Sequence, residues 1–416
     1  MSALAGTADV VIVGAGLAGL ACARQVVAAG LDVVVLESTD AAGGRIRTDP
    51  VDGFLLDRGF QVLNDSYPEL ARAVDLDALD LKPFLRGALL RVDGRRHRLV
   101  DPRQRPGALG STVTALATAP VGSLADRARL GALVVRAARG DGRRLVDDPD
   151  VGTRDLLRAR GISTTTIDRL ANPFFRGVFL EEDMATSSRF FSLVARTFAR
   201  GQACLPARGM QSLPQQIADS LPTGTVHLSN PVRAVRSHGV DTEAGTMTAR
   251  AVVVAVDPVA AGRLVEGVAV PPMRSVTTWY HSPAEAPTDE AIIALDADGG
   301  PVASSIVLTN AAPTYGPAGR ALVATSVVGP RILGDADLAR HLGELWGTST
   351  AGWDLIGRVE VPEALPAAFP PLAPRLRRSV EVGGVYVAGD HRDTPSIQGA
   401  LVSGRRVAEA VVAATG

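Results

Sequence analysis

The first fifty residues constrain the fold of this chain more than any other segment. Val10-Val11-Ile12-Val13 predicts a short buried strand, and it is followed by Gly14-Ala15-Gly16-Leu17-Ala18-Gly19, which fits the pattern GxGxxG. An apolar helix pattern runs from Leu20 to Ala29, and a second strand is expected from Asp32 to Leu36, followed by the acid Glu37. Strand, glycine turn, helix, strand and acid in this order predict a βαβ unit that binds a dinucleotide.

Each part of this unit has a physical task. Gly14 makes the tight turn, Gly16 lets the backbone approach a pyrophosphate, and Gly19 lets the helix pack on the strand. The phosphates lie at the helix N-terminus, where unpaired N–H groups and the dipole favour anions. Glu37 stands where a carboxylate binds the adenosine ribose 2′-hydroxyl and repels a 2′-phosphate, which indicates FAD or NAD and not NADP. A glycine turn without a ligand is the alternative, and the register of all the parts argues against it.

Two short motifs downstream separate FAD from NAD. Gly43-Gly44-Arg45 follows the acid within a few residues, and Asp57-Arg58-Gly59-Phe60 follows the strand-like run Phe54-Leu55-Leu56. This arrangement resembles the superfamily of flavin amine oxidases, phytoene desaturases and protoporphyrinogen oxidases, in which a GGR turn and a D-x-G turn against the flavin follow the first βαβ unit. The resemblance implies FAD as the cofactor.

The resemblance returns in distant segments and covers most of the chain. Pro206-Ala207-Arg208-Gly209-Met210 is similar to the P-x-G-G-M turn of the family, with Arg208 in place of the first glycine. Asn230-Pro231-Val232 is similar to the segment whose valine contacts the adenine. Val385 to Asp390 is a strand ending in A-G-D, and Ser396 to Gly404 opens the last helix. In the family, that aspartate binds the ribityl or phosphate part of FAD, and that helix start faces the flavin pyrimidine ring.

Together, the motifs and the resemblance predict one cofactor site. Its predicted residues are Gly14, Ala15, Gly16, Leu17, Ala18, Gly19, Glu37, Ser38, Gly43, Gly44, Arg45, Gly59, Phe60, Val232, Gly389, Asp390, Ile397 and Ala400.

We expect an α/β fold: a Rossmann-like FAD-binding domain of the GR2 type with a discontinuous α+β substrate domain. A chain of 416 residues exceeds what a single core usually holds. The nucleotide motifs assign residues 1–75, 205–265 and 375–416 to the FAD-binding domain. Residues 76–204 and 266–374 are left for the substrate domain, which the family builds as a cap over the flavin.

The two insertions differ in pattern. The first is mostly helical, and in its segment from Ser123 to Arg139 an apolar stripe of Leu124, Ala128, Leu130, Val134 and Val135 is expected opposite Asp126, Arg127 and Arg129. A hairpin is expected to turn at Asp93-Gly94. The second insertion predicts strands followed by a helix from Asp337 to Trp346, and the proline-rich stretch Pro362 to Pro374 is expected to connect the domains.

Charge and cysteine usage exclude several classes of function. The formal net charge is −1, so no overall field favours nucleic acid. Cys22 and Cys204 form neither a metal-ligand pair nor a disulfide framework, and the six histidines lack metal-site spacing, so no metal is expected. Because no signal peptide or apolar span is visible, we expect a cytoplasmic protein, with peripheral membrane contact left open. The sequence does not specify an oligomeric state.

Departures from the amine oxidase pattern bear on the reaction. Amine oxidases of this fold usually hold a lysine by a water at flavin N5, and the corresponding strand, Arg274 to His281, has none. They often place an aromatic residue where this chain has Ser396, and the final block is more similar to that of desaturases. The resemblance therefore predicts dehydrogenation or desaturation of an apolar, isoprenoid-like small molecule, with oxygen or a quinone as electron acceptor. The alternatives are amine oxidase or protoporphyrinogen-oxidase-like activity, and a non-catalytic flavin-bound binding or scaffolding protein.

Catalytic side chains are harder to assign than the cofactor site. His391 lies between the A-G-D turn and the last helix, which makes it a candidate for proton transfer, and a surface turn is the alternative. Trp279 and Tyr280 occupy alternate positions of a strand, so one of them faces the opposite side from the other, and Tyr280 is the second catalytic candidate. The aromatic segment Asn172 to Phe179 either packs into the cap core or lines the substrate cavity.

Overall fold

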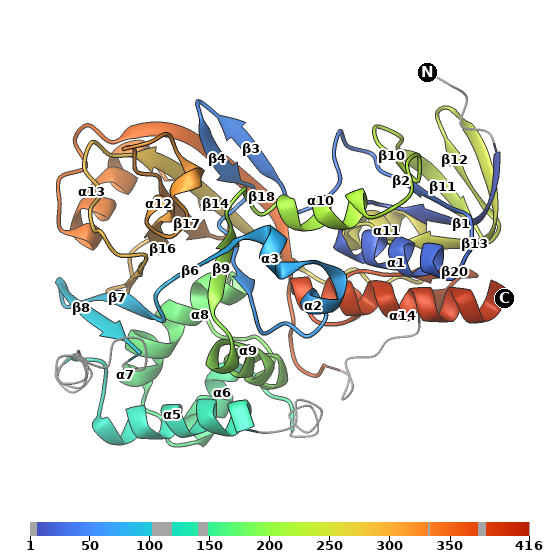
Figure 1. Ribbon diagram of the computed structural model, residues 1–416. Coiled ribbons are helices and arrows are strands. Elements are labelled where there is room, and N and C mark those ends of the chain that lie inside the picture. Colours follow the sequence, from blue (N-terminus) through green and yellow to red (C-terminus); the bar gives the residue numbers. More distant parts are fainter. Residues whose placement is uncertain (1–5, 102–118, 140–148, 332, 373–379, 416) are drawn as a thin grey trace.

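The computed structural model describes residues 6–101, 119–139, 149–331, 333–372 and 380–415. Two large sheets form the framework (Figure 1). One contains the first strand and lies beside the C-terminal helix, at the right of the view, and the other lies at the left, above a group of helices. Within the described residues, none of the helices is both long and apolar enough to cross a membrane.

The first sheet has eight strands and a mainly parallel centre. Strand β1 pairs in parallel with β2 on one side and with β13 on the other, and β20 pairs in parallel with β13. The order β10-β2-β1-β13-β12-β11 ends in an antiparallel meander. The strands are β1 (Gly6–Val13), β2 (Val33–Leu36), β10 (Val226–His227), β11 (Val232–Arg236), β12 (Gly239–Thr242), β13 (Gly245–Val254), β19 (Glu381–Val382) and β20 (Val385–Val387).

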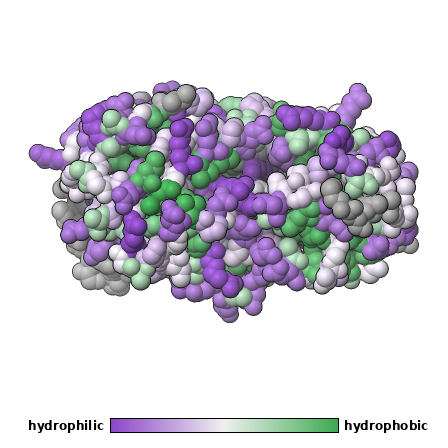
Figure 2. Space-filling view, turned by 90° about the horizontal axis from the view of Figure 1, so that it is seen from above, coloured by the Kyte–Doolittle hydropathy of each residue, from purple (hydrophilic) through white to green (hydrophobic). Residues whose placement is uncertain are grey.

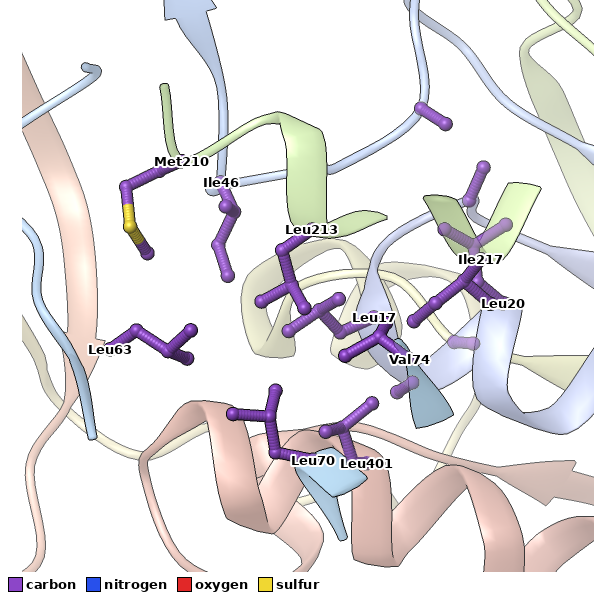
Figure 3. Close-up of a cluster of buried hydrophobic side chains, with 14 of the residues drawn as sticks. Leu17, Leu20, Ile46, Leu63, Leu70, Val74, Met210, Leu213, Ile217 and Leu401 are labelled. Atoms are coloured by element: carbon purple, nitrogen blue, oxygen red, sulfur yellow. The ribbon is translucent and has the colours of Figure 1, made fainter. Parts of the chain in front are cut away.

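Helices cover both faces of this sheet. Side chains alternate along β1, so each face of the strand packs against a different group of helices. Val10 and Ile12 pack toward the helices α1 (Leu17–Ala28), α10 (Ser212–Asp219) and α14 (Ile397–Thr415), whereas Val11 and Val13 pack toward α11 (Pro258–Leu264). Figure 3 shows the apolar cluster on the α1 side, where leucine and isoleucine side chains from α1, α10 and α14 converge. The segment from Val10 to Val13 is therefore continuously hydrophobic, as a strand segment covered on both faces must be.

The second sheet has seven strands in the order β18-β14-β17-β16-β15-β7-β8, mostly antiparallel. One face packs against helix α13 (Asp335–Trp346) in a core that includes Trp279 and Trp346. Two short helical segments, α12 (Leu308–Ala311) and Pro313–Tyr315, follow β16. The strands are β7 (Gly87–Val92), β8 (Arg95–Val100), β14 (Met273–Ser282), β15 (Ile293–Asp296), β16 (Val302–Val307), β17 (Val323–Val328) and β18 (Asp354–Pro366).

A layer of helices and two small sheets complete the structure. The helices of the layer are α5 (Leu124–Arg139), α6 (Thr153–Ala159), α7 (Thr164–Thr166), α8 (Asn172–Phe179) and α9 (Ser188–Arg200), with a π-helical turn at Ile167–Ala171 between α7 and α8. The small sheets are β3 (Thr48–Val51) with β4 (Phe54–Asp57), and β5 (Leu63–Asn64) with β9 (Ala203–Pro206) and β6 (Leu81–Pro83). Short helices α2 (Leu70–Ala73) and α3 (Leu76–Leu79) lie between β5 and β6.

Several local predictions are confirmed and two are wrong. The hairpin turns at Asp93 and Gly94, both with positive φ, and the helix expected to end at Trp346 does so. The predicted stripe on α5 is wrong, because Leu124 and Val135 are 64% and 45% exposed while Asp126 is buried and binds Arg129.

The prediction of a proline-rich connector from Pro362 to Pro374 is also wrong for its first part. Residues 362–366 end the thirteen-residue strand β18, which pairs with β14 at the edge of the second sheet. An edge strand tolerates proline because it needs ladder hydrogen bonds on one side only. Residues 373–374 lie outside the described residues.

The predicted division of the chain remains a prediction. The first sheet takes its strands from three separated parts of the chain, 6–36, 226–254 and 381–387. These parts fall within the segments that we expected to form the FAD-binding domain.

Exposed large hydrophobic side chains are scattered, and the face seen in Figure 2 carries hydrophobic patches separated by hydrophilic side chains.

Candidate active site

The three glycines of the first loop serve two different purposes. A Cβ added at Gly14, where φ is +101°, would lie 2.9 Å from the Ala255 carbonyl oxygen, and one at Gly19 would lie 2.0 Å from the Gly14 carbonyl oxygen. Both positions therefore allow backbones to approach closely. A Cβ at Gly16 would meet nothing within 4 Å. Gly16 caps helix α1 without a side-chain hydrogen bond, so the free N–H groups of α1 face open space where a phosphate fits.

Glu37 is fixed at the end of β2 beside this loop. One carboxylate oxygen accepts the N–H of Ala15 at 2.8 Å, and the other accepts the N–H and the hydroxyl of Thr39 at 2.9 and 2.8 Å. The Asn230 N–H donates to the Glu37 carbonyl, which brings the segment expected at the adenine beside the acid expected at the ribose. A carboxylate can accept further hydrogen bonds, so Glu37 is held in place with capacity left for a ribose hydroxyl.

A partly buried ion pair joins the first motifs to the last. Arg45 Nη2 donates to Asp390 Oδ1 at 2.7 Å, and Arg45 Nη1 donates to the Ala364 carbonyl at the end of β18 at 3.1 Å. The Gly389 N–H donates to the Ser403 hydroxyl of α14 at 3.1 Å. The GGR turn, the A-G-D turn, the last helix and the edge of the second sheet therefore meet at one place.

One cavity of about 1640 Å³ runs between these motifs and the second sheet. All the predicted cofactor-binding residues except Ala15 and Gly19 line it. Ala15 is fully buried with its N–H on Glu37, and Gly19 packs beneath Gly14, so both support the loop without reaching the cavity. A single small molecule usually occupies a pocket of about 300 to 1,000 Å³, so this cavity has room for a cofactor and a substrate together.

The part of the cavity that the cofactor motifs do not line, called the far half below, is mainly apolar. Its apolar walls come from the β6–β7 loop, α8, α9 and the second sheet: Phe84, Leu85, Phe174, Val178, Leu180, Phe190, Leu193, Val194, Phe198, Val276, Ile293, Leu295 and Ile306. Phe60 of the cofactor motif contacts Phe84 of the far half with ring centroids 6.2 Å apart. The two halves therefore adjoin.

Polar residues also line the far half, and sequence reasoning missed them. They are Tyr67, Arg86, Asp101, Arg196, Thr197, Gln202 and Ser304. No local motif marks Tyr67. Alternation along the predicted strand from Ser304 to Leu308 is the one signal that could have placed Ser304 and Ile306 on the same face.

The structure does not bring the two catalytic candidates to the cavity wall. Tyr280 is fully buried, and its hydroxyl donates to the Asp57 carbonyl at 2.6 Å. Trp279 packs on the opposite face of the sheet against α13. His391 lies in a buried turn with its ring against Gly389, and it is not among the lining residues. Alternation along the strand predicted that Trp279 and Tyr280 point to opposite faces of the sheet. They do, but protein covers both faces.

The aromatic segment from Asn172 to Phe179 has both of the roles that were considered. Phe174 and Val178 line the cavity. Phe175 and Phe179 stack on each other in the core of the helical layer, with ring centroids 5.3 Å apart. One face of α8 thus lines the cavity, and another face of the same helix packs into the core.

A buried carboxyl connects the cofactor motifs to the second sheet. Asp57 accepts hydrogen bonds from the Thr48 hydroxyl, the Met210 N–H and the Tyr315 hydroxyl. Its carbonyl accepts the Tyr280 hydroxyl of β14. Burial raises the pKa of Asp57 to about 6, and the three donors oppose that rise. Asp57 therefore links the D-x-G turn, the segment expected as the P-x-G-G-M turn, and the second sheet.

A GxGxxG loop beside a buried acid, opening into an apolar cavity, defines a class of protein, the dinucleotide-binding proteins. Comparison with known families specifies the class further. Residues 17–412 match the family described as "Flavin containing amine oxidoreductase". The chain belongs to this family, and it is an FAD-dependent oxidoreductase.

Individual relatives resemble this chain over shorter segments. Putrescine oxidase of Kocuria rosea is 45% identical over 94 residues, which are 21% of this chain and 19% of the relative. Coproporphyrinogen III oxidase of Propionibacterium freudenreichii subsp. freudenreichii is 30% identical over 176 residues, 41% of this chain and 31% of the relative. The matched segments thus span less than a third of these relatives.

The fold extends the likeness to the whole chain. The structure of a putative protoporphyrinogen oxidase from Exiguobacterium sp. 255-15 matches with a TM-score of 0.75 at 17% identity, covering 99% of this chain and 100% of that one. The predicted α/β fold class is confirmed by this match.

Proposed function

We propose that this protein removes hydrogen from an apolar, isoprenoid-like substrate and transfers it to FAD. The observation that carries the proposal is the far half of the cavity, whose walls are aromatic and aliphatic and adjoin the flavin motifs. Burying apolar surface in such walls supplies binding free energy of about 25 cal/mol per Å². A long hydrocarbon substrate is therefore held mainly by its shape and its apolar area.

Features that an amine substrate would require are weak in this site. A carboxylate would stabilise a protonated amine, and Asp101 is the one acid among the far-half residues named above; the other acids of the described cavity lining, Glu37, Asp257, Asp390 and Asp393, lie in or beside the cofactor motifs. Lys82, the only lysine of the chain, lies in β6 and binds Asp80 at 2.8 Å, and Ser396 occupies the position of the expected aromatic residue. Ser396 caps α14 by accepting the Gly399 N–H at 3.0 Å.

FAD, when bound, accepts the hydride equivalent that leaves the substrate C–H bond. The residues of this chain position the two partners. Ile397 and Ala400 at the start of α14 line the cavity, so the N–H groups of this helix favour negative charge there. The Phe60 N–H donates a hydrogen bond to the Thr278 hydroxyl of β14 at 3.2 Å. This bond holds Phe60 at the boundary between the two halves of the cavity. The apolar far half excludes water from the reacting bond.

A porphyrinogen is the second candidate substrate. Arg86 and Arg196 line the far half, and the carboxylates of a porphyrinogen would pair with arginine side chains. Arg196 already donates to two carbonyls of α5. We rank the apolar substrate first because the aliphatic and aromatic wall is far more extensive than these two cationic groups.

Anaerobic mixing experiments test the proposal. Putrescine, benzylamine and tryptamine should leave the flavin absorbance near 450 nm unchanged (roughly the oxidised-flavin band), whereas phytoene or squalene in detergent should bleach it. A porphyrinogen tests the second candidate in the same assay. Rapid bleaching by an amine, with none by the polyenes, would contradict the proposal.

The electron acceptor is tested on the same protein. We propose oxygen or a quinone. After photoreduction, fast reoxidation in air identifies oxygen, and slow reoxidation in air with fast transfer to a quinone identifies the quinone. A reduced flavin that reacts with neither would instead support a non-catalytic binding role.

We include a peripheral membrane contact in the proposal because an apolar substrate dissolves in membranes. Helix α5 exposes Leu124 and Val135 to 64% and 45%, and the exposed Arg139 lies at its end. Co-sedimentation with phosphatidylglycerol vesicles should exceed that with phosphatidylcholine. Leu124→Asp with Val135→Asp should abolish it, and equal sedimentation of this variant and the parent would contradict the contact.

A further inference from the structure

Ser304 places a polar group in the apolar wall of the far half. It belongs to β16, is 4% exposed, and lines the cavity beside Ile306. Within the described part of the chain, its hydroxyl has no hydrogen-bond partner. The hydroxyl opens onto the cavity, where an oxygen atom of a bound substrate can be its hydrogen-bond partner.

The neighbouring hydroxyls of the same sheet do have partners. The Ser305 hydroxyl pairs with Thr325 Oγ1 at 3.0 Å and accepts Trp346 Nε1–H at 2.9 Å. Ser326, which lies opposite Ser304 on β17, pairs with Thr278 Oγ1 at 3.1 Å. Ser304 therefore stands out from the serines around it, because it faces the cavity and they face protein partners.

Gly177 keeps this hydroxyl open to the cavity. It lies within helix α8 and lines the cavity, and a Cβ added there would lie 3.8 Å from Ser304 Oγ and 4.0 Å from Ser304 Cβ, with nothing nearer. These are ordinary contact distances, so alanine would fit and would favour the helix. A methyl group at residue 177 would, however, cover the Ser304 hydroxyl. The glycine thus leaves a gap that the packing of α8 on the sheet does not require.

We propose that Ser304 and the gap at Gly177 form a hydrogen-bonding niche for an oxygen atom of the substrate. This rests on the proposed function, and it specifies the substrate class as an apolar, isoprenoid-like molecule that carries a hydroxyl or carbonyl group. A serine hydroxyl both donates and accepts, so it satisfies either group. An ionised carboxylate is disfavoured, because a single neutral hydroxyl does not compensate the loss of its hydration.

The experiment compares two C20 ligands on the FAD-loaded protein: geranylgeraniol, which has a hydroxyl, and phytane, which is a hydrocarbon. Dissociation constants come from titrating the shift of the flavin absorbance spectrum in detergent. The parent protein should prefer the alcohol by about fivefold, the value of one neutral hydrogen bond. Ser304→Ala should remove the preference and leave the affinity for phytane unchanged. Gly177→Ala should also reduce the preference, with a melting temperature no lower than that of the parent.

Two further variants separate the niche from other effects. Ser305→Ala is the matched control, because this serine lies on the same strand and faces away from the cavity, so the preference should persist. Tyr67→Phe removes another hydroxyl from the cavity wall. Loss of the preference in Tyr67→Phe, with retention in Ser304→Ala, would overturn the assignment of the niche.

The remaining outcomes distinguish this inference from the proposed function. If phytane and geranylgeraniol bind the parent equally, the niche is refuted while the apolar substrate site stands. If neither ligand binds the parent, both the apolar substrate site and the niche are refuted.

Discussion

Substituting two glycines of the first loop should produce opposite effects. Gly16 has φ −73° and ψ 176°, which a β-branched residue adopts, and its added Cβ meets nothing within 4 Å. Gly16→Val should therefore change the stability of the apoprotein by no more than about 0.5 kcal/mol. The valine would nevertheless fill the space that the pyrophosphate needs. Losing two charge-assisted hydrogen bonds costs about 3 to 6 kcal/mol, which weakens FAD binding by more than about 100-fold.

Gly19→Ala should instead destabilise the protein itself. Its Cβ would lie 2.0 Å from the Gly14 carbonyl oxygen, so the backbone must shift. Overpacking of this kind costs about 1 to 3 kcal/mol and outweighs the helix propensity gained, which is at most about 1 kcal/mol. Thermal unfolding of both apoproteins and FAD titration of both variants check the pair. A Gly16→Val protein that retains FAD after desalting, or one that is less stable than Gly19→Ala, would refute the reasoning.

Three further substitutions test other parts of the site. Glu37→Ala should weaken FAD binding by about 1.5 to 3 kcal/mol, and equal flavin occupancy of variant and parent after dialysis would contradict the ribose assignment. Because the pKa of Asp57 is raised to about 6 in the folded protein, the native state binds more protons between pH 4 and 6, and stability should fall by about 3 kcal/mol as pH rises through this window. Urea unfolding of Asp57→Asn should lack this fall, and parallel profiles would exclude Asp57 as its source. Arg45→Met should cost about 1 to 3 kcal/mol by leaving Asp390 unpaired, and adding Asp390→Asn should recover part of the loss; additive losses would argue against the pairing.

The parts of the fold that the sequence predicted well depend on local patterns. The first βαβ unit follows from the apolar run Val10 to Val13, the glycines and the acid, which all lie within forty residues of one another. The hairpin at Asp93-Gly94 follows from two residues that adopt positive φ. Strand β18 was missed because Pro362 and Pro366 indicate a connector, and only its place at the sheet edge makes those prolines acceptable.

Side-chain direction was the harder problem. Asp126 was expected on the solvent face of α5, yet it is buried, and its carboxylate accepts a hydrogen bond from the Thr166 hydroxyl, which lies 40 residues away in the sequence. Tyr280 was considered for catalysis, yet its hydroxyl is bonded to Asp57, which lies 223 residues away in the sequence. Such partners come from tertiary packing, so local periodicity cannot identify them. The same applies to Ser304, whose significance depends on the gap at Gly177.

The long-range contacts explain how a site with few polar groups can still direct a reaction. Arg45 and Asp390 close the cofactor motifs on one another, while Asp57 attaches the same motifs to the second sheet through Tyr280 and Tyr315. The surfaces that face the cofactor and the substrate are therefore parts of one connected framework. The hydride transfer that we propose needs the reacting atoms held about 3 to 3.5 Å apart and aligned, and a connected framework favours this alignment. We infer that specificity for the proposed substrate comes from the shape of the apolar wall and from the polar side chains that interrupt it.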